Sequence, residues 1–194
     1  MQKLTRQNLY SLEQYSEIRN EFRKQLIEHK RDRRLQLGAN ATLYFEDSLT
    51  MKYQVQEMLR IEKIFDAAAI VDELDAYNPL IPDGSNWKAT FMVEFPDVDE
   101  RREKLQQLVG IEDSVWLQIG ALEKVRPIAD EDLQRDDVDK TSAVHFLRFE
   151  LDQAGVKALK GGAELAAGID HRNYRVEVRP VADNIRKALL NDLD

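Results

Sequence analysis

Apolar side chains recur every three or four residues along the first third of the chain, which is the spacing of one face of an α-helix. Residues 11–34 carry one such stripe, and residues 48–65 carry a second one, with Ser48 as its expected N-cap. A shorter third helix is expected to end at Asn78, because the residue before Pro79 avoids the helical region. The N-terminal part of the chain therefore predicts two long helices and one short helix.

Alternation of apolar and polar residues replaces this pattern from Trp87 onward. Successive side chains of a strand point to opposite faces, so this period predicts strands with one buried face. The same period occurs near residues 35–46, 115–119, 142–151 and 165–178. We expect an α+β fold, with a mostly antiparallel sheet of about six to eight strands and the two long N-terminal helices packed on it. The expected shared core comprises Phe91, Val93, Phe95, Leu117, Ile119, Leu147 and Phe149.

The order strand, helix, strand, strand occurs twice, in residues 87–128 and in residues 142–179. Each expected helix follows an aspartate that can cap it, Asp97 or Asp152, and each ends at a glycine. The two segments share little sequence identity. The pattern therefore indicates either an internal duplication of a β-α-β-β unit or the chance recurrence of a common arrangement. We treat residues 1–194 as a single domain.

Composition narrows the classes of protein to which the chain can belong. Its 194 residues include no cysteine, which excludes disulfides, thiolate metal sites and a cysteine nucleophile. The absence of a signal sequence and of any apolar run of about 20 residues favours a cytoplasmic protein without membrane contact. The net charge is −8, with +4 in the first 40 residues and −12 in the remainder. So acidic a body disfavours phosphate contacts, and we expect no binding of nucleic acid.

Four stretches of the sequence together resemble a bacterial family catalogued as domain of unknown function 3501. They are YQVQEMLR at 53–60, ELDAYNPLIP at 73–82, GIED at 110–113 and KTSAVHFLRF at 140–149. The resemblance covers nearly the whole chain, and NPLIP is its most specific part. It implies a bacterial cytosolic accessory protein near redox chemistry, because genes of the family often neighbour those of rubrerythrin-like and iron–sulfur oxidoreductase proteins. It implies no catalytic residue.

The second expected helix places one carboxylate among apolar residues. At about 100° per residue, Glu62 is closest in angle to Val55, Met58 and Leu59. A buried carboxylate must be paired, bound to a metal or protonated. We therefore expect Glu62 to be buried, either in an ion pair with an arginine or in a metal or acid–base role.

The histidines give a weak signal for a metal site. His145 falls on the apolar face of a strand, and His29 falls on the apolar stripe of the first helix. Together with Glu57 and Glu62 they would offer the mixed donors that suit iron, manganese or zinc. The alternative is that each histidine is a core residue bonded to the backbone, and no Glu-x-x-His spacing favours the metal. Glu62 and His145 are also the candidate catalytic residues.

Polar side chains share the outward positions of the strands with one aromatic residue. Trp116, Arg148 and Glu150 alternate with the core positions of their strands, and we expect them on one outer sheet face. Such a face could bind a small anionic or aromatic ligand. The alternative is a solvated face with ion pairs between neighbouring strands.

A proline-rich loop follows the third helix. Pro79 and Pro82 stiffen it, which lowers the entropy lost when the loop orders against a partner. Its apolar residues either plug the protein's own core or contact another protein, and its oxygen-rich turn could instead hold Ca²⁺ or Mg²⁺. We expect a protein partner, if there is one, to bind at residues 77–86. The candidate contact residues are Tyr77, Asn78, Leu80 and Ile81.

Two charged segments complete the pattern. Residues 130–139 hold six carboxylates, which predicts a solvated loop or a docking site for a basic partner. Residues 30–34 form a basic cluster, which is explained by the stabilising effect of cations at the end of a helix. The sequence contains no glycine-rich phosphate loop and no G-x-S-x-G nucleophile motif.

These patterns favour a non-catalytic cytosolic accessory protein that binds a protein partner or a small ligand. The alternative is a small metal- or carboxylate-dependent enzyme that uses Glu62 and His145. A purely structural homo-oligomer is a third class. No residue pattern identifies a cofactor or an oligomeric state.

Overall fold

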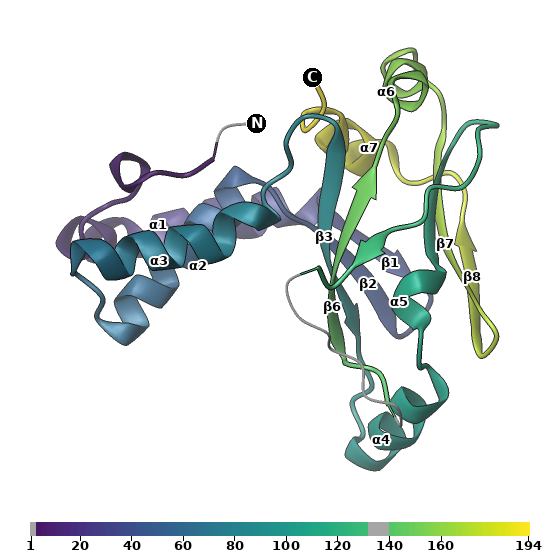
Figure 1. Ribbon diagram of the computed structural model, residues 1–194, viewed down its shortest axis with the longest axis horizontal. Coiled ribbons are helices and arrows are strands. Elements are labelled where there is room, and N and C mark those ends of the chain that lie inside the picture. Colours follow the sequence, from purple (N-terminus) through teal and green to yellow (C-terminus); the bar gives the residue numbers. More distant parts are fainter. Residues whose placement is uncertain (1–2, 132–139) are drawn as a thin grey trace.

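Two antiparallel sheets form the body of the molecule (Figure 1). The computed structural model describes residues 3–131 and 140–194. Within these residues, the larger sheet has five strands in the order β1-β2-β3-β6-β5, and the smaller has three in the order β4-β7-β8. The strands are β1 (Arg34–Leu37), β2 (Ala41–Phe45), β3 (Asn86–Val93), β4 (Val115–Ile119), β5 (Ile128–Ala129), β6 (Val144–Glu150), β7 (Leu165–His171) and β8 (Tyr174–Val178). The predicted α+β class and mostly antiparallel pairing are confirmed, with the strands divided between two sheets.

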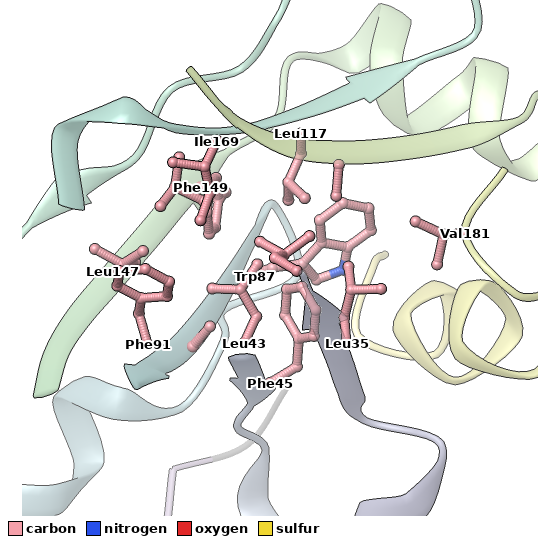
Figure 2. Packing of buried hydrophobic residues seen from close by; sticks show 14 of the residues in the cluster. Leu35, Leu43, Phe45, Trp87, Phe91, Leu117, Leu147, Phe149, Ile169 and Val181 are labelled. Atoms are coloured by element: carbon pink, nitrogen blue, oxygen red, sulfur yellow. The ribbon is translucent and has the colours of Figure 1, made fainter. Parts of the chain in front are cut away.

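The two sheets bury alternate side chains between them (Figure 2). Trp87, Ala89 and Phe91 of β3 are buried, whereas Lys88 and Thr90, which alternate with them, are partly exposed. Leu117 and Ile169 of the smaller sheet lie opposite them in the same cluster (Figure 2). All seven residues of the predicted core belong to this cluster, so that prediction is confirmed.

Three helices extend from the sheets as an N-terminal projection (Figure 1). They are α1 (Leu12–Arg31), α2 (Ser48–Glu62) and α3 (Ala67–Tyr77). The first two pack on each other, and the third packs on α2. Met51, Val55 and Leu59 of α2 contribute to a second apolar cluster inside the projection. The two predicted long helices are present, but they pack mainly on each other rather than on a sheet.

Side-chain caps determine where these helices begin. Ser11 caps α1, and its Oγ accepts a hydrogen bond from the backbone of the first turn. The Asp47 carboxylate caps α2 by accepting from Thr50 N at 2.9 Å. Ser48, the predicted cap, is therefore the first helical residue. α2 ends at Glu62, and its C-cap residue, Lys63, adopts the left-handed conformation with φ of 56°.

Two of the remaining helices begin where the repeated pattern predicts. Asp97 and Asp152 cap α4 and α6, as predicted. β3 pairs with β6 and β4 pairs with β7, both antiparallel, as two related units would. The last strand of each unit differs. In the second unit, β8 pairs with β7 along its length. In the first unit, Val125 forms only a single bridge with Leu117, and the chain then continues into β5 of the larger sheet. The duplication itself stays a prediction. The other helical segments are η1 (Arg6–Asn8), η2 (Asn78–Leu80), α4 (Val98–Gln107), α5 (Ile111–Ser114), α6 (Gln153–Lys160) and α7 (Asp183–Leu190).

A buried arginine joins the larger sheet to the C-terminal end of the chain. Arg33 is only 3% exposed and binds the carboxylate of Asp192. It also donates to the carbonyls of Phe45 and Glu46, each at 3.0 Å, and lies 3.4 Å from the Asp47 carboxylate. One cation of the predicted basic cluster is therefore inside the protein.

Two further observations concern membrane-spanning helices and the acidic loop. In the described part of the chain, no helix is long and apolar enough to cross a lipid bilayer. The predicted acidic loop at residues 130–139 lies outside the described residues from residue 132 onward. Docking of a basic partner there stays a prediction.

Replacing Phe91 by alanine tests the shared core. Because Phe91 is fully buried between the sheets, Phe91→Ala should lower the free energy of unfolding by about 3–5 kcal/mol. Val98→Ala is the control, since Val98 is 60% exposed on α4 and its loss should change that free energy by less than about 0.5 kcal/mol. Urea denaturation followed by circular dichroism measures both. Similar effects of the two substitutions would contradict the proposed core.

Candidate functional site

A pocket of about 500 Å³ lies on the outer face of the larger sheet, beside the proline-rich loop. Its volume is within the range of about 300–1,000 Å³ that is typical of small-ligand sites. It brings together Leu80 and Arg148, which the sequence placed in two separate candidate sites. The polar lining residues are Glu46, Asp83, Asn86, Lys88, Glu131 and Arg148, and the apolar ones include Pro79, Leu80 and Phe146.

The register of the strands places three charged residues in one row across this pocket. Lys88 of β3 lies directly opposite Arg148 of β6. Glu46 N donates to the Lys88 carbonyl at 2.8 Å, which continues the β2–β3 ladder by one residue. Because side chains alternate along a strand, the three point away from the core face. Adjacent strands are about 4.8 Å apart, so neighbouring charges in the row are close enough to interact.

Carboxylates hold Arg148 on both sides. Its Nε and Nη2 donate to the two oxygens of Glu131, both at 2.7 Å, and its Nη1 binds Glu150. The hydrogen bonds from Arg148 to Glu131 and Glu150 raise the pKa of the guanidinium. The hydrogen bonds between Arg148 and Glu131 also lower the pKa of the Glu131 carboxyl. Glu150 also accepts from Asn86 Nδ2 at 3.0 Å. Ion pairs, the alternative expected for this sheet face, are therefore present around Arg148.

Lys88 has a neutral partner where a carboxylate would be usual. Its Nζ donates to the Pro79 carbonyl. Burial of the side chain, together with the positive charge of Arg148, lowers the pKa of the Lys88 ammonium. Two like charges directly opposite each other on paired strands are destabilising. The carboxylates of Asp83, Glu131 and Glu150 partly offset this effect on the pKa of Lys88, and a further negative group beside the ammonium would add to theirs.

Glu46 contributes a buried negative charge to the same pocket. The residue is 7% exposed. Its Oε1 accepts from Thr90 Oγ1 at 2.7 Å, whereas its Oε2 is buried without a hydrogen-bond partner. A buried carboxylate oxygen that lacks a partner costs free energy. A ligand donor that reaches this carboxylate from the pocket would remove that cost.

The proline-rich loop packs against other parts of the same chain. Ile81 is 5% exposed and belongs to the apolar cluster of the helical projection, so the alternative of a plug for the protein's own core applies to it. Leu80 is half buried and lines the pocket. Asn78 bonds both backbone groups of Leu4, at 2.8 and 3.0 Å, and Tyr77 packs beside the same cluster.

Trp116 belongs to the other sheet. It lies on the outer side of β4, opposite Gly168 of β7, where a Cβ would collide with the indole ring. The Lys124 ammonium covers the ring at 3.8 Å from its centroid. The expectation that Trp116 shares one face with Arg148 and Glu150 is wrong, because β4 and β6 belong to different sheets, whose outer faces point in opposite directions.

His145 lies at the centre of a buried polar cluster near the start of β6. Its Nδ1 is 2.6 Å from Asp130 Oδ2, and its Nε2 is 2.9 Å from Thr141 Oγ1 and 3.1 Å from the Ser142 carbonyl. Glu112 lies 3.8 Å from the ring. The ring is fully buried. This is the environment of a core histidine, with a carboxylate partner in addition to the backbone.

The other expected metal ligands have partners elsewhere. Glu57 accepts from Tyr15 Oη at 2.7 Å and from Nε and Nη2 of Arg19 at 2.7 and 2.8 Å. His29 Nε2 is 2.5 Å from Asp47 Oδ2. Among the described residues, no group of three or more His, Asp or Glu side chains is placed to hold a metal ion. The structure therefore does not bring the four expected ligands together.

Glu62 is exposed, so the prediction that it is buried is wrong. Its angular neighbours Val55 and Leu59 are buried, as the helix pattern predicts. However, Glu62 is the last residue of α2, and at this end of the helix its side chain is exposed to solvent. α2 runs away from the sheets (Figure 1). Its 15 residues give it a length of about 22 Å. Glu62 therefore does not share a site with His145.

Comparisons with other proteins identify the relatives of this chain. A family model described as a protein of unknown function (DUF3501) matches residues 3–193. The chain belongs to the DUF3501 family. A crystal structure of a protein of unknown function from Burkholderia pseudomallei is 48% identical, with a TM-score of 0.94 over 100% of both chains. A comparison with curated proteins gives no match.

The pocket of this DUF3501 protein contains two charges that sequence reasoning missed. Glu46 stands at the junction of β2 and α2, where neither the strand period nor the helix period applies. The only signal was the acidic pair Glu46-Asp47 directly after an apolar strand. Asp47 accounts for one of the two as a helix cap, and Glu46 has no such role. From the sequence, Lys88 could be assigned only to the outward-facing side of a strand.

Glu57 provides a test of pH dependence. Hydrogen bonds from Arg19, assisted by Arg60 and Tyr15, lower the pKa of the Glu57 carboxyl from its ordinary 4.5 to about 2. A lowered pKa stabilises the fold above pH 4.5, and this contribution is lost as the pH falls from 4.5 towards 2. Glu57→Gln should therefore lower the free energy of unfolding by about 2–3 kcal/mol at pH 7 and by about half as much at pH 3.

Glu62→Gln is the matched control on the same helix. Since Glu62 is exposed, this change should alter the free energy of unfolding by less than about 0.5 kcal/mol at either pH. Urea denaturation at pH 7 and pH 3 measures both variants. A loss at Glu57 that does not depend on pH would contradict the role given to its charge.

Proposed function

We propose that this DUF3501 protein is a non-catalytic binding protein that takes up a small charged ligand in the pocket at Lys88. The observation that carries the proposal is Glu46, a buried carboxylate with one oxygen that has no partner. Buried polar atoms in folded proteins are normally satisfied, and an exception points to a ligand or another functional role.

The composition of the pocket supports this proposal. A few polar groups converge on a wall formed by apolar atoms of Pro79, Leu80 and Phe146. Ligand sites commonly combine an apolar wall with a small number of placed polar groups. The two prolines of the loop hold this wall in position before a ligand binds, which reduces the entropy lost on binding.

The enzyme alternative receives less support from the geometry. His145 is fully buried on the core side of β6, and Glu62 is at the far end of α2. A protein partner at residues 77–86, a cytoplasmic location, a link to redox systems and the absence of nucleic-acid binding stay predictions. The pocket requires none of them.

A substitution that fills the pocket tests the proposed function. Leu80→Trp adds a large side chain to the wall, and Leu122→Trp adds one to a surface position of the smaller sheet's first turn that is 39% exposed. Thermal unfolding would be measured with monocarboxylates, dicarboxylates, amines and amino acids, each at millimolar concentration. A ligand at about 100 times its Kd should add about 2.7 kcal/mol to the free energy of unfolding.

The expected result is a ligand-dependent rise in Tm for the unmodified protein and for Leu122→Trp, and no rise for Leu80→Trp. Equal rises in all three proteins would place binding outside this pocket. No rise with any compound of the panel would contradict the proposed function.

A further inference from the structure

Three charged residues of the pocket, Glu46, Asp83 and Lys88, form no hydrogen bond to an opposite charge among the described residues. Arg148 has two carboxylate partners, Glu131 and Glu150. In the described residues, Lys88 donates to a carbonyl, Glu46 accepts from a hydroxyl, and Asp83 accepts from the backbone and hydroxyl of Ser85. Of these three, Lys88 and Glu46 are the cation and the anion that the sheet places in neighbouring positions.

These two charges are neighbours that do not pair with each other. Glu46 follows β2 and is hydrogen-bonded through its backbone to Lys88 of β3. Opposite charges in such positions ordinarily form a cross-strand pair. Here the Glu46 carboxylate turns to Thr90 and the Lys88 ammonium turns to Pro79. A group carrying one charge of each sign could contact both residues within one strand spacing, about 4.8 Å.

We propose that the ligand is an α-amino acid with an apolar side chain, bound as a zwitterion. Its ammonium group donates to the Glu46 carboxylate, and its carboxylate accepts from Lys88 Nζ. An ammonium group has three donors, so Lys88 can keep its bond to the Pro79 carbonyl while it binds the carboxylate. The assignment rests on the function proposed above and deepens it.

The walls of the pocket select the side chain of the ligand. Leu80 and Phe146 present apolar atoms beside the charged row. Arg148 is already engaged by carboxylates, so a second acidic group on the ligand would find no unengaged cation there. An apolar side chain matches this surface better than a charged one.

Calorimetric titration with matched analogues tests the assignment. The probes are L-leucine, L-methionine and L-phenylalanine, each beside the amine that lacks the carboxylate and the acid that lacks the ammonium group. At least one amino acid should bind the unmodified protein, and removal of either charged group should weaken that binding by about 10- to 100-fold.

Glu46→Gln assigns the ammonium contact. The amide keeps an oxygen acceptor for Thr90 but removes the charge, so binding of the amino acid and of the amine should weaken by about 10- to 100-fold. Binding of the deaminated acid should not change. Glu94→Gln is the control, because Glu94 is an exposed glutamate near the end of β3 that does not line the pocket. Should Glu46→Gln fail to fold, the analogue series with the unmodified protein decides alone.

The outcomes separate this assignment from the proposed function. If the deaminated acid binds as tightly as the amino acid, the ligand is a simple anion and the amino-acid assignment fails, while the binding function stands. The same holds if no amino acid binds but another compound raises Tm in a manner abolished by Leu80→Trp. If no compound of either series binds, both proposals fail.

Discussion

The antiparallel pairing of β3 with β6 is the constraint on which the rest of the structure depends. Its register sets Phe91 opposite His145 and Lys88 opposite Arg148. Side chains alternate along both strands, so this one register sends the first pair toward the core and the second pair to the outer face. A slip of one residue would place the charged row between the two sheets and the aromatic residues in solvent.

The buried ion pair of Arg33 connects this pairing to the rest of the larger sheet. Its guanidinium binds Asp192 near the C-terminus and donates to the carbonyls of Phe45 and Glu46. Removing one partner of a buried pair is strongly destabilising, because the other charge stays buried. The contact to the Glu46 carbonyl fixes the backbone where β2 ends and α2 begins. The same contact therefore holds the position from which the Glu46 side chain enters the pocket.

Periodicity predicts the faces of the elements in this protein, and contacts between distant elements decide the rest. The alternation from Trp87 onward correctly predicted which residues form the core. It could not assign each strand to a sheet, so Trp116 was expected beside Arg148 although the two lie on opposite outer faces. The helix pattern likewise predicted the buried stripe of α2, but it did not predict that Glu62, at the end of this stripe, is exposed.

The pocket itself was predictable only in part, for the same reason. Leu80 and Arg148 were candidates from separate patterns, and only the fold shows that they line one pocket. Glu46 lies between two periods, so its burial results from the β2–β3 ladder and not from any local pattern.

The energetic cost of this arrangement favours a functional interpretation of the pocket. Lys88 opposite Arg148 is a repulsive pair, and the unpaired oxygen of Glu46 is a desolvated acceptor. Neither strengthens the core, which the inward faces of the same strands complete without them. A sequence under selection for stability alone would place neutral or paired side chains at these positions, and departures of this kind concentrate at functional sites. Because both unfavourable features line the same pocket and have opposite charge, one ligand with two charges could relieve them together.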